Sequence, residues 1–133
     1  MADQSRRDLY LLINLTNGSL WLNNVDLAGA ELANVDLARV DLRNANLAGA
    51  DLRGAKLTSA DLEGANPSHT NLDGADLYEA NLMNFDLRGV NLHRATIEDA
   101  TTGGARYSDS TVWPADIDPE ELGAVRAEPR GWQ

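Results

Sequence analysis

The stretch from Ala45 to Gly54 reads ANLAGADLRG, two copies of a five-residue unit that recurs through most of this 133-residue chain. Each unit has leucine at its centre, usually Asp or Asn immediately before it, and a small apolar residue two positions before it. A period of five fits neither the 3.6-residue period of an α-helix nor the two-residue period of a β-strand, so the chain is a repeat protein. The central leucines are Leu22, Leu27, Leu32, Leu37, Leu42, Leu47, Leu52, Leu57, Leu62, Leu72, Leu77, Leu82, Leu87 and Leu92.

Two apolar positions in every five suit a chain that turns a corner after each unit, and four such sides close a square coil of about twenty residues. Units such as VDLAG, ADLRG and ADLEG resemble those of the pentapeptide-repeat family over residues 20–100, and the match fades through about residue 114. The resemblance implies an all-β fold, a right-handed quadrilateral β-helix with leucines stacked inside and tight turns at the corners. Gly29 and Gly49 fall two residues after a leucine, where a corner favours a residue that tolerates unusual dihedral angles.

The register continues beyond the leucines and predicts Ile97, Thr102, Tyr107 and Val112 as further central residues. From Leu22 to Val112 this makes a little under five coils. At a strand spacing of about 4.8 Å per coil, the predicted rod is roughly 23 Å tall.

One unit departs from the repeat at Pro67, which stands where leucine is expected. One coil later on the same side, Phe85 replaces the small residue. Our preferred interpretation is that Phe85 fills the space that Pro67 leaves, so that the side-chain volume of the two coils is conserved. The functional alternative is a local kink or binding notch at Pro67, His69 and Phe85.

The ends of a solenoid expose sheet edges and core, so caps are expected at both. Residues 1–19 are predicted to form an N-terminal helical cap, with a capping box at Ser5 and Asp8. The β-helix is predicted to span residues 20–114.

Residues 115–133 are predicted to form a C-terminal cap helix and a tail. The helix is expected to start with Asp118 as its N-cap and Pro119 at its first position, and to end near Val125. Trp113 is expected to pack inward beside it. The alternative is that one cap forms the surface of an end-to-end homodimer; we favour a monomer.

The amino-acid composition and net charge exclude several classes of function. The chain has no cysteine, which excludes disulfides, thiolate metal sites and a cysteine nucleophile. The net charge of −10 argues against direct nucleic-acid binding and against anionic membranes, and it allows a basic protein partner. No apolar run approaches the length of a membrane span, so a soluble cytoplasmic protein is expected.

The sequence offers no catalytic constellation. His69 and His93 fall in outward positions on different sides of the coil, so no metal site is expected. No nucleophile elbow or phosphate loop is present, and the paired acids point outward into water, where carboxylates are poor acid–base catalysts. We therefore expect neither an enzyme nor a bound cofactor.

Outward charges gather on two neighbouring sides of the predicted coil, with three and two excess negative charges. This acidic edge is the candidate partner surface, although its residues also fit simple solvated repeat positions. Its members are Asp61, Glu63, Asp76, Tyr78, Glu79, Met83, Glu98 and Asp99.

The leading interpretation is a non-enzymatic scaffold or protein-interaction module with an unidentified protein partner. The alternative, suggested by the family resemblance, is a DNA-mimicking binder of DNA gyrase of the quinolone-resistance type. DNA carries one charge per ~1.7 Å of its axis, so a rod this short imitates only about seven base pairs. A monomer is therefore a poor mimic, and an end-to-end dimer would be a better one.

Overall fold

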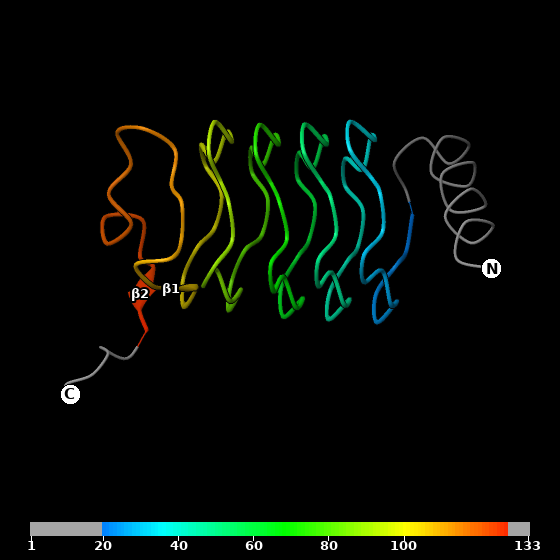
Figure 1. Cartoon of the computed structure of the whole chain (residues 1–133), viewed down its shortest axis with the longest axis horizontal. Coiled ribbons are helices and arrows are strands. Elements are labelled where there is room, and N and C mark those ends of the chain that lie inside the picture. Colours follow the sequence, from blue (N-terminus) through cyan, green and yellow to red (C-terminus); the bar gives the residue numbers. More distant parts are fainter. Residues whose placement is uncertain (1–19, 128–133) are drawn as a thin grey trace.

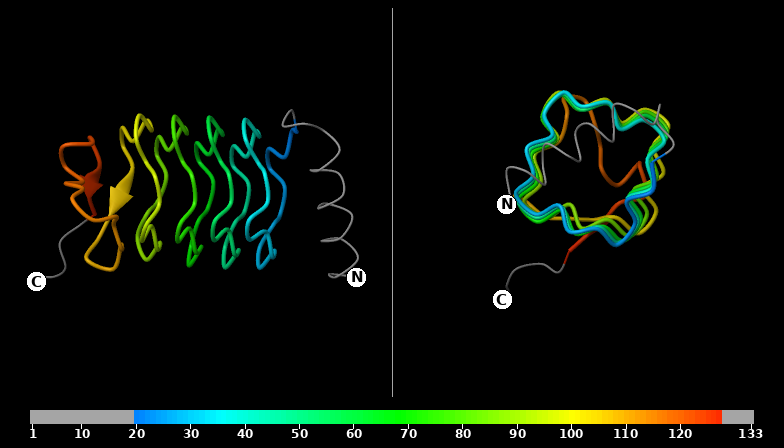
Figure 2. Two further views of the ribbon diagram at one scale, coloured as in Figure 1. Left: turned by 90° about the horizontal axis from the view of Figure 1, so that it is seen from above. Right: turned by 90° about the vertical axis from the view of Figure 1, so that its right-hand side faces the viewer.

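The chain winds as a stack of similar coils around one axis (Figure 1), and the coils superpose in the view along that axis (Figure 2). The computed structural model describes residues 20–127. Parallel bridges join residues that lie twenty positions apart, from the Trp21–Asp41 pair to the Asp86–Arg106 pair. This spacing is the one expected of a four-sided coil with five residues per side. The predicted helical cap at 1–19 lies outside the described residues.

Most sides of the coil carry a single bridging residue, so within residues 20–127 only two segments qualify as strands. These are β1, Arg106–Tyr107, and β2, Val125–Arg126. They pair in parallel, with Arg106 opposite Val125. The extended pairing is therefore concentrated at the C-terminal end of the stack (Figure 1).

Each corner is a hydrogen-bonded turn. The N–H of Ala45, for example, donates to the carbonyl of Leu42 at 3.0 Å. The second residue after the centre has a positive φ at every corner from Asn24 to Gly104, as a type II turn requires. The glycines expected at corners are indeed there, with φ of 70° at Gly29 and 69° at Gly49.

The Asp or Asn before the leucine has a structural role as a hydrogen-bond acceptor. Four of the five N–H groups in a regular unit donate to backbone carbonyls, and the fifth, directly after the leucine, has no such partner. The Asp or Asn side chain accepts this fifth N–H, as Asp41 does from Arg43 and Asn46 does from Ala48, both at 3.1 Å. Much of the negative charge of the chain therefore serves the turns.

The interior is a column of leucines flanked by small residues. The central leucines from Leu32 to Leu92 are at most 2% exposed, and each contributes about 2 kcal/mol through the apolar surface it buries. Phe85 is the largest side chain that is fully buried.

The irregular unit interrupts the hydrogen-bond ladder on one side of the stack. Three backbone bonds join residues 45–49 to residues 65–69, but within the described chain none joins residues 65–69 to residues 85–89. Pro67 lacks the N–H that a leucine would donate at this level. Pro67 and Phe85 are both buried, which favours packing over an exposed notch.

The predicted register is wrong at Val112. Asn91 pairs with Val112, which is 21 residues away instead of 20, because one extra residue is accommodated in the turn after Tyr107. Thr111 now takes the small-residue inward position, two residues before Trp113, and its hydroxyl donates to the carbonyl of Leu87 at 2.7 Å. Val112 is 46% exposed, and Trp113 packs against the core in its place.

The predicted C-terminal cap helix is also wrong within the described part of 115–133. Asp118 does accept the N–H of Glu120, at 3.0 Å, as an N-cap would. However, Gly123 has a φ of 85°, and the next N–H, from Ala124, donates back to the carbonyl of Pro119, which closes a Schellman motif. The turn that starts at Asp118 therefore closes at Gly123, before the predicted end near Val125, and the chain continues into β2.

This turn nevertheless covers the end of the core. Trp113, Ile117 and Leu122 are partly buried and pack against it. The carbonyl of Leu122 accepts a hydrogen bond from the hydroxyl of Thr102, which ties the turn to the last regular coil.

Candidate functional site

The structure divides the predicted acidic edge into two groups. Tyr78, Glu79, Glu98 and Asp99 lie at one corner of two successive coils, and we call them the acidic corner. The carboxylates of Glu79, Asp99 and Glu98, in that order of effect, together with some burial, raise the pKa of the Tyr78 hydroxyl. The N–H of Glu79 donates to the carbonyl of Glu98 at 3.1 Å, which joins the two coils at this corner.

The second group lies on the neighbouring side, around Arg43. Asp61 accepts a hydrogen bond from the Asn81 amide at 3.1 Å and lies 3.7 Å from the Arg43 guanidinium. The pKa of Arg43 is raised mainly by its hydrogen bond to Asp41, with smaller contributions from Asp61 and Glu63.

Met83 and Asp76 complete the predicted set. Met83 occupies the repeat position of Glu63 one coil later and is 37% exposed. Asp76 precedes the acidic corner and accepts hydrogen bonds from the Tyr78 N–H at 3.1 Å and the Thr58 hydroxyl at 3.2 Å. By register, the eight predicted residues lie on two neighbouring sides of the coil.

The acidic corner differs from the other corners in its backbone. The residues with positive φ stack in four rows, one for each corner of the coil. Three rows consist almost entirely of glycine and asparagine, which accept this conformation most readily. The fourth row contains neither, at a cost of roughly 1 kcal/mol per residue. Its members are Arg39, Ser59, Glu79 and Asp99.

The acidic corner also differs in its charge balance. Elsewhere many acids pair with arginine: Asp41 with Arg43, Asp51 with Arg53, Asp86 with Arg88 and Asp73 with Arg94, at N–O distances of 2.6–2.9 Å. These hydrogen bonds lower the pKa of each of the four carboxyl groups. Within residues 20–127, no ion pair involves Glu79, Glu98 or Asp99, so their charge is not balanced by an adjacent cation.

An apolar cavity of about 440 Å³ adjoins the acidic corner, and we call it the corner cavity. Glu98 and Asp99 belong to both features. The rest of the lining comes from the last regular coil and from the C-terminal turn: Ala95, Thr96, Ile97, Pro114, Ala115, Ile117 and Leu122. The sequence did not suggest this cavity, because it depends on how residues 114–122 fold back.

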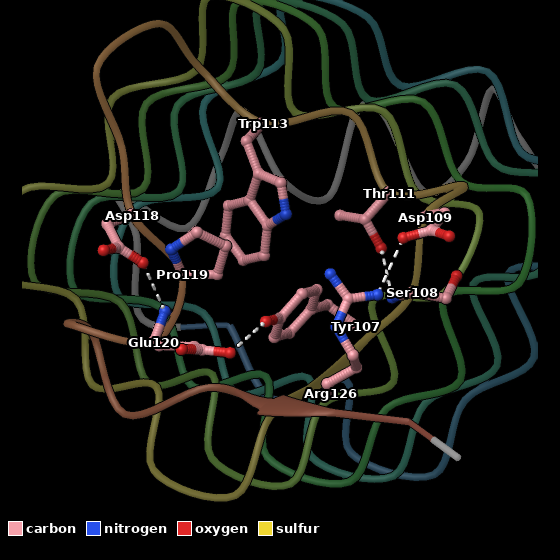
Figure 3. A pocket seen from close by; sticks show the side chains of 9 residues that line it. All are labelled: Tyr107, Ser108, Asp109, Thr111, Trp113, Asp118, Pro119, Glu120 and Arg126. Carbon is pink, nitrogen blue, oxygen red and sulfur yellow. Dashed lines mark hydrogen bonds and ion pairs between the residues drawn. The ribbon is translucent and has the colours of Figure 1, made fainter. Parts of the chain in front are cut away.

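A second cavity of about 440 Å³ lies at the C-terminal end of the stack, and we call it the end cavity (Figure 3). Tyr107 and Trp113 meet inside it at an angle of 78°, with their ring centroids 5.7 Å apart. Its lining consists of Tyr107, Ser108, Asp109, Thr111, Trp113, Asp118, Pro119, Glu120 and Arg126.

Polar contacts connect opposite sides of the end cavity (Figure 3). The Arg126 guanidinium lies 5.0 Å from the centre of the Tyr107 ring and pairs with Asp109 at 2.7 Å. The Tyr107 hydroxyl donates to Glu120 at 3.1 Å. Burial, followed by this hydrogen bond, raises the pKa of Tyr107.

The described residues contain no group of three His, Cys, Asp or Glu side chains that could hold a metal ion. His93 lies 3.5 Å from Asp73, which also pairs with Arg94, and His69 is exposed at a corner. In residues 20–127 there is also no helix of the length and apolarity needed to cross a bilayer.

Comparison with known proteins supports the fold. The sequence pattern described as "Pentapeptide repeats" matches in eight copies, over residues 22–58, 50–89 and 71–101. No curated protein sequence matches the chain. Among solved structures, the chain is similar to alr5209, a pentapeptide repeat protein from Nostoc PCC 7120, with 32% identity, a TM-score of 0.54, and coverage of 92% of this chain and 93% of that one.

Two further structures are similar. AT2G44920, a pentapeptide repeat protein from the Arabidopsis thaliana thylakoid lumen, has 31% identity and a TM-score of 0.58, covering 77% of this chain and 71% of that one. A trypsin-treated form of QnrB1, a plasmid-mediated fluoroquinolone resistance protein, has 20% identity and a TM-score of 0.52, covering 80% of this chain and 64% of that one; this likeness concerns the fold alone. The repeat, the twenty-residue bridging and these matches establish that the chain belongs to the pentapeptide-repeat family.

Proposed function

We propose that the chain is a non-enzymatic protein-interaction module that binds a basic segment of a protein partner at the acidic corner. The observation that carries the proposal is the charge balance of Glu79, Glu98 and Asp99. They are not needed to accept the N–H after a leucine, as the Asp and Asn before each leucine are, and no described arginine or lysine pairs with them. Uncompensated charge attracts an oppositely charged partner and speeds its association.

The corner cavity adds an apolar contact beside this charge. Ile97, Ile117 and Leu122 line it, and Glu98 and Asp99 lie at the same place. A partner segment with lysine or arginine next to an apolar side chain would complement both features. Interfaces of this kind combine an apolar centre with a polar rim.

The proposal is tested by charge removal at matched sites. The corner variant carries Glu79→Ser, Glu98→Thr and Asp99→Asn. Its Ser copies Ser59, one coil before Glu79, and its Thr copies Thr58, two coils before Glu98. The control variant carries Asp26→Asn, Glu31→Gln and Asp36→Asn, which remove the same charge from the first coil.

Immobilised wild type and both variants are incubated with native lysate, and the captured proteins are quantified by mass spectrometry. We expect a protein that wild type and the control retain, that the corner variant loses at least about tenfold, and that salt releases. Equal capture by all three proteins would contradict the proposal.

The gyrase-mimic alternative receives less support from the charge distribution. The uncompensated acids occupy two adjacent coils, about 5 Å apart along the axis, a length over which DNA presents about three charges. A supercoiling assay with purified DNA gyrase separates the two functions. We expect no inhibition at excess protein, and dose-dependent inhibition would favour the mimic.

A further inference from the structure

We propose that the end cavity binds an organic cation, a primary ammonium or guanidinium group on a short alkyl chain. This site shares no residue with the acidic corner or the corner cavity, so it stands independently of the proposed function. Such a group could belong to a free amine or to a lysine or arginine side chain of a partner, and the experiment below distinguishes these sources.

The first argument is charge. Three carboxylates line the end cavity, from Asp109, Asp118 and Glu120, and one cation, Arg126, faces them. The Arg126–Asp109 ion pair accounts for one charge of each sign, which leaves an excess of two negative charges. A cavity with this balance selects a cation over an anion.

The second argument is the aromatic pair. The faces of Tyr107 and Trp113 carry negative partial charge, and their planes stand nearly perpendicular, so they form two walls of the cavity. The Arg126 guanidinium already rests over the Tyr107 ring. The protein thus uses one of these rings to hold a cation of its own, in the arrangement that an external cation would adopt.

The third argument is unused acceptor capacity. Asp118 uses Oδ1 to accept the N–H of Glu120, and Glu120 uses Oε2 to accept the Tyr107 hydroxyl. Each carboxylate keeps its second oxygen, and both residues lie on the side of the cavity opposite Arg126 (Figure 3). These oxygens can accept charge-assisted hydrogen bonds from an ammonium or guanidinium group.

Size agrees with this ligand class. The cavity volume of about 440 Å³ accommodates a chain of several carbons as well as the charged group. Pro119 and the rings of Tyr107 and Trp113 supply apolar surface for such a chain.

The test follows the indole N–H signal of Trp113 by NMR, assigned with a Trp113→Phe variant. The probes are n-butylammonium chloride, spermidine and N-acetyl-lysine methylamide, each at constant ionic strength, with sodium chloride and sodium butyrate as controls. We expect saturable shifts of the Trp113 signal with the ammonium probes and none with the controls. A stronger response to the lysine derivative would indicate a protein side chain as the ligand, and a stronger response to spermidine would indicate a free amine.

Two variants check the assignment to this cavity. Asp118→Asn with Glu120→Gln keeps the hydrogen-bond acceptors but removes the charge, and should weaken butylammonium binding at least fivefold, whereas Asp26→Asn with Asp36→Asn should leave it unchanged. Arg126→Gln removes the internal cation and should strengthen binding, since the face of the Tyr107 ring becomes available. A probe concentration of 0.1 M is about a hundredfold above a millimolar Kd, so the absence of a saturable shift there would overturn the proposal. Equal weakening of butylammonium binding by the Asp118/Glu120 variant and the Asp26/Asp36 variant would overturn it as well.

Discussion

The hypothesis that Phe85 fills the space left by Pro67 leads to a quantitative prediction. Phe85 is fully buried, and replacing a buried phenylalanine by alanine costs about 3–5 kcal/mol of unfolding free energy. Pro67→Leu alone should lower the unfolding free energy by about 1–3 kcal/mol through overpacking against Phe85. If the new N–H restores the missing hydrogen bond between the coils, that bond returns about 1 kcal/mol. With both changes together, the leucine would occupy the space vacated by the phenylalanine, as in a regular unit.

We therefore expect the double variant to be more stable than the sum of the two single changes by at least about 1 kcal/mol. The free energies come from urea unfolding at 25 °C, followed by circular dichroism, with the m-value checked for each variant. The matched control pairs Pro67→Leu with Val90→Ala, because Val90 is equally buried but lies at the small position of the next side. If both pairs are additive within about 0.5 kcal/mol, the packing relation is refuted.

Three further predictions concern the turns and the surface charges. Glu79→Gly should raise the unfolding free energy by about 0.5–1 kcal/mol, since glycine accepts the φ of 59° without strain; a loss of stability in urea unfolding would show that this row is not strained. Asp51→Ala should lower the unfolding free energy by about 1 kcal/mol through loss of the turn hydrogen bond from the Arg53 N–H, whereas Asp51→Asn should retain most of that bond. Equal losses of unfolding free energy in the two variants would contradict this role of Asp51. Arginine partners lower the folded-state pKa of Asp41, Asp51 and Asp86. These ion pairs therefore contribute stability above the unfolded pKa of 3.8, and the contribution is lost as the pH falls through the folded-state pKa values. A pH series of melting temperatures should show this decline, and high salt should make it smaller.

The acidic corner shows how far the sequence leads toward a site. Sorting outward residues by the twenty-residue period brought Tyr78, Glu79, Glu98 and Asp99 to one corner, where the structure has them. The same sorting placed Asp61 and Glu63 on the neighbouring side together with Arg43, and Asp61 lies 3.7 Å from the Arg43 guanidinium. A stronger sequence signal was available, because that row is the one without glycine or asparagine at the turn position.

The end cavity had no comparable signal. It depends on the extra residue after Tyr107, on the one-turn closure at Gly123 and on the pairing of β2 with β1. The start signal at Asp118 was located correctly, but the predicted end near Val125 was wrong. The chain closes at Gly123, five residues after Asp118, which leaves room for a single turn only.

The sequence by itself determined the coil, because the interactions that define each unit lie within five residues. The leucine, the small residue, the turn and the Asp or Asn that accepts the free N–H are all local, so the repeat specifies them wherever it occurs. Only the tertiary structure decided the shift of register at Val112, the form of the C-terminal cap and both cavities. These features arise from contacts between residues on different coils, or between the coils and the cap, and their outcome depends on packing that no single unit encodes.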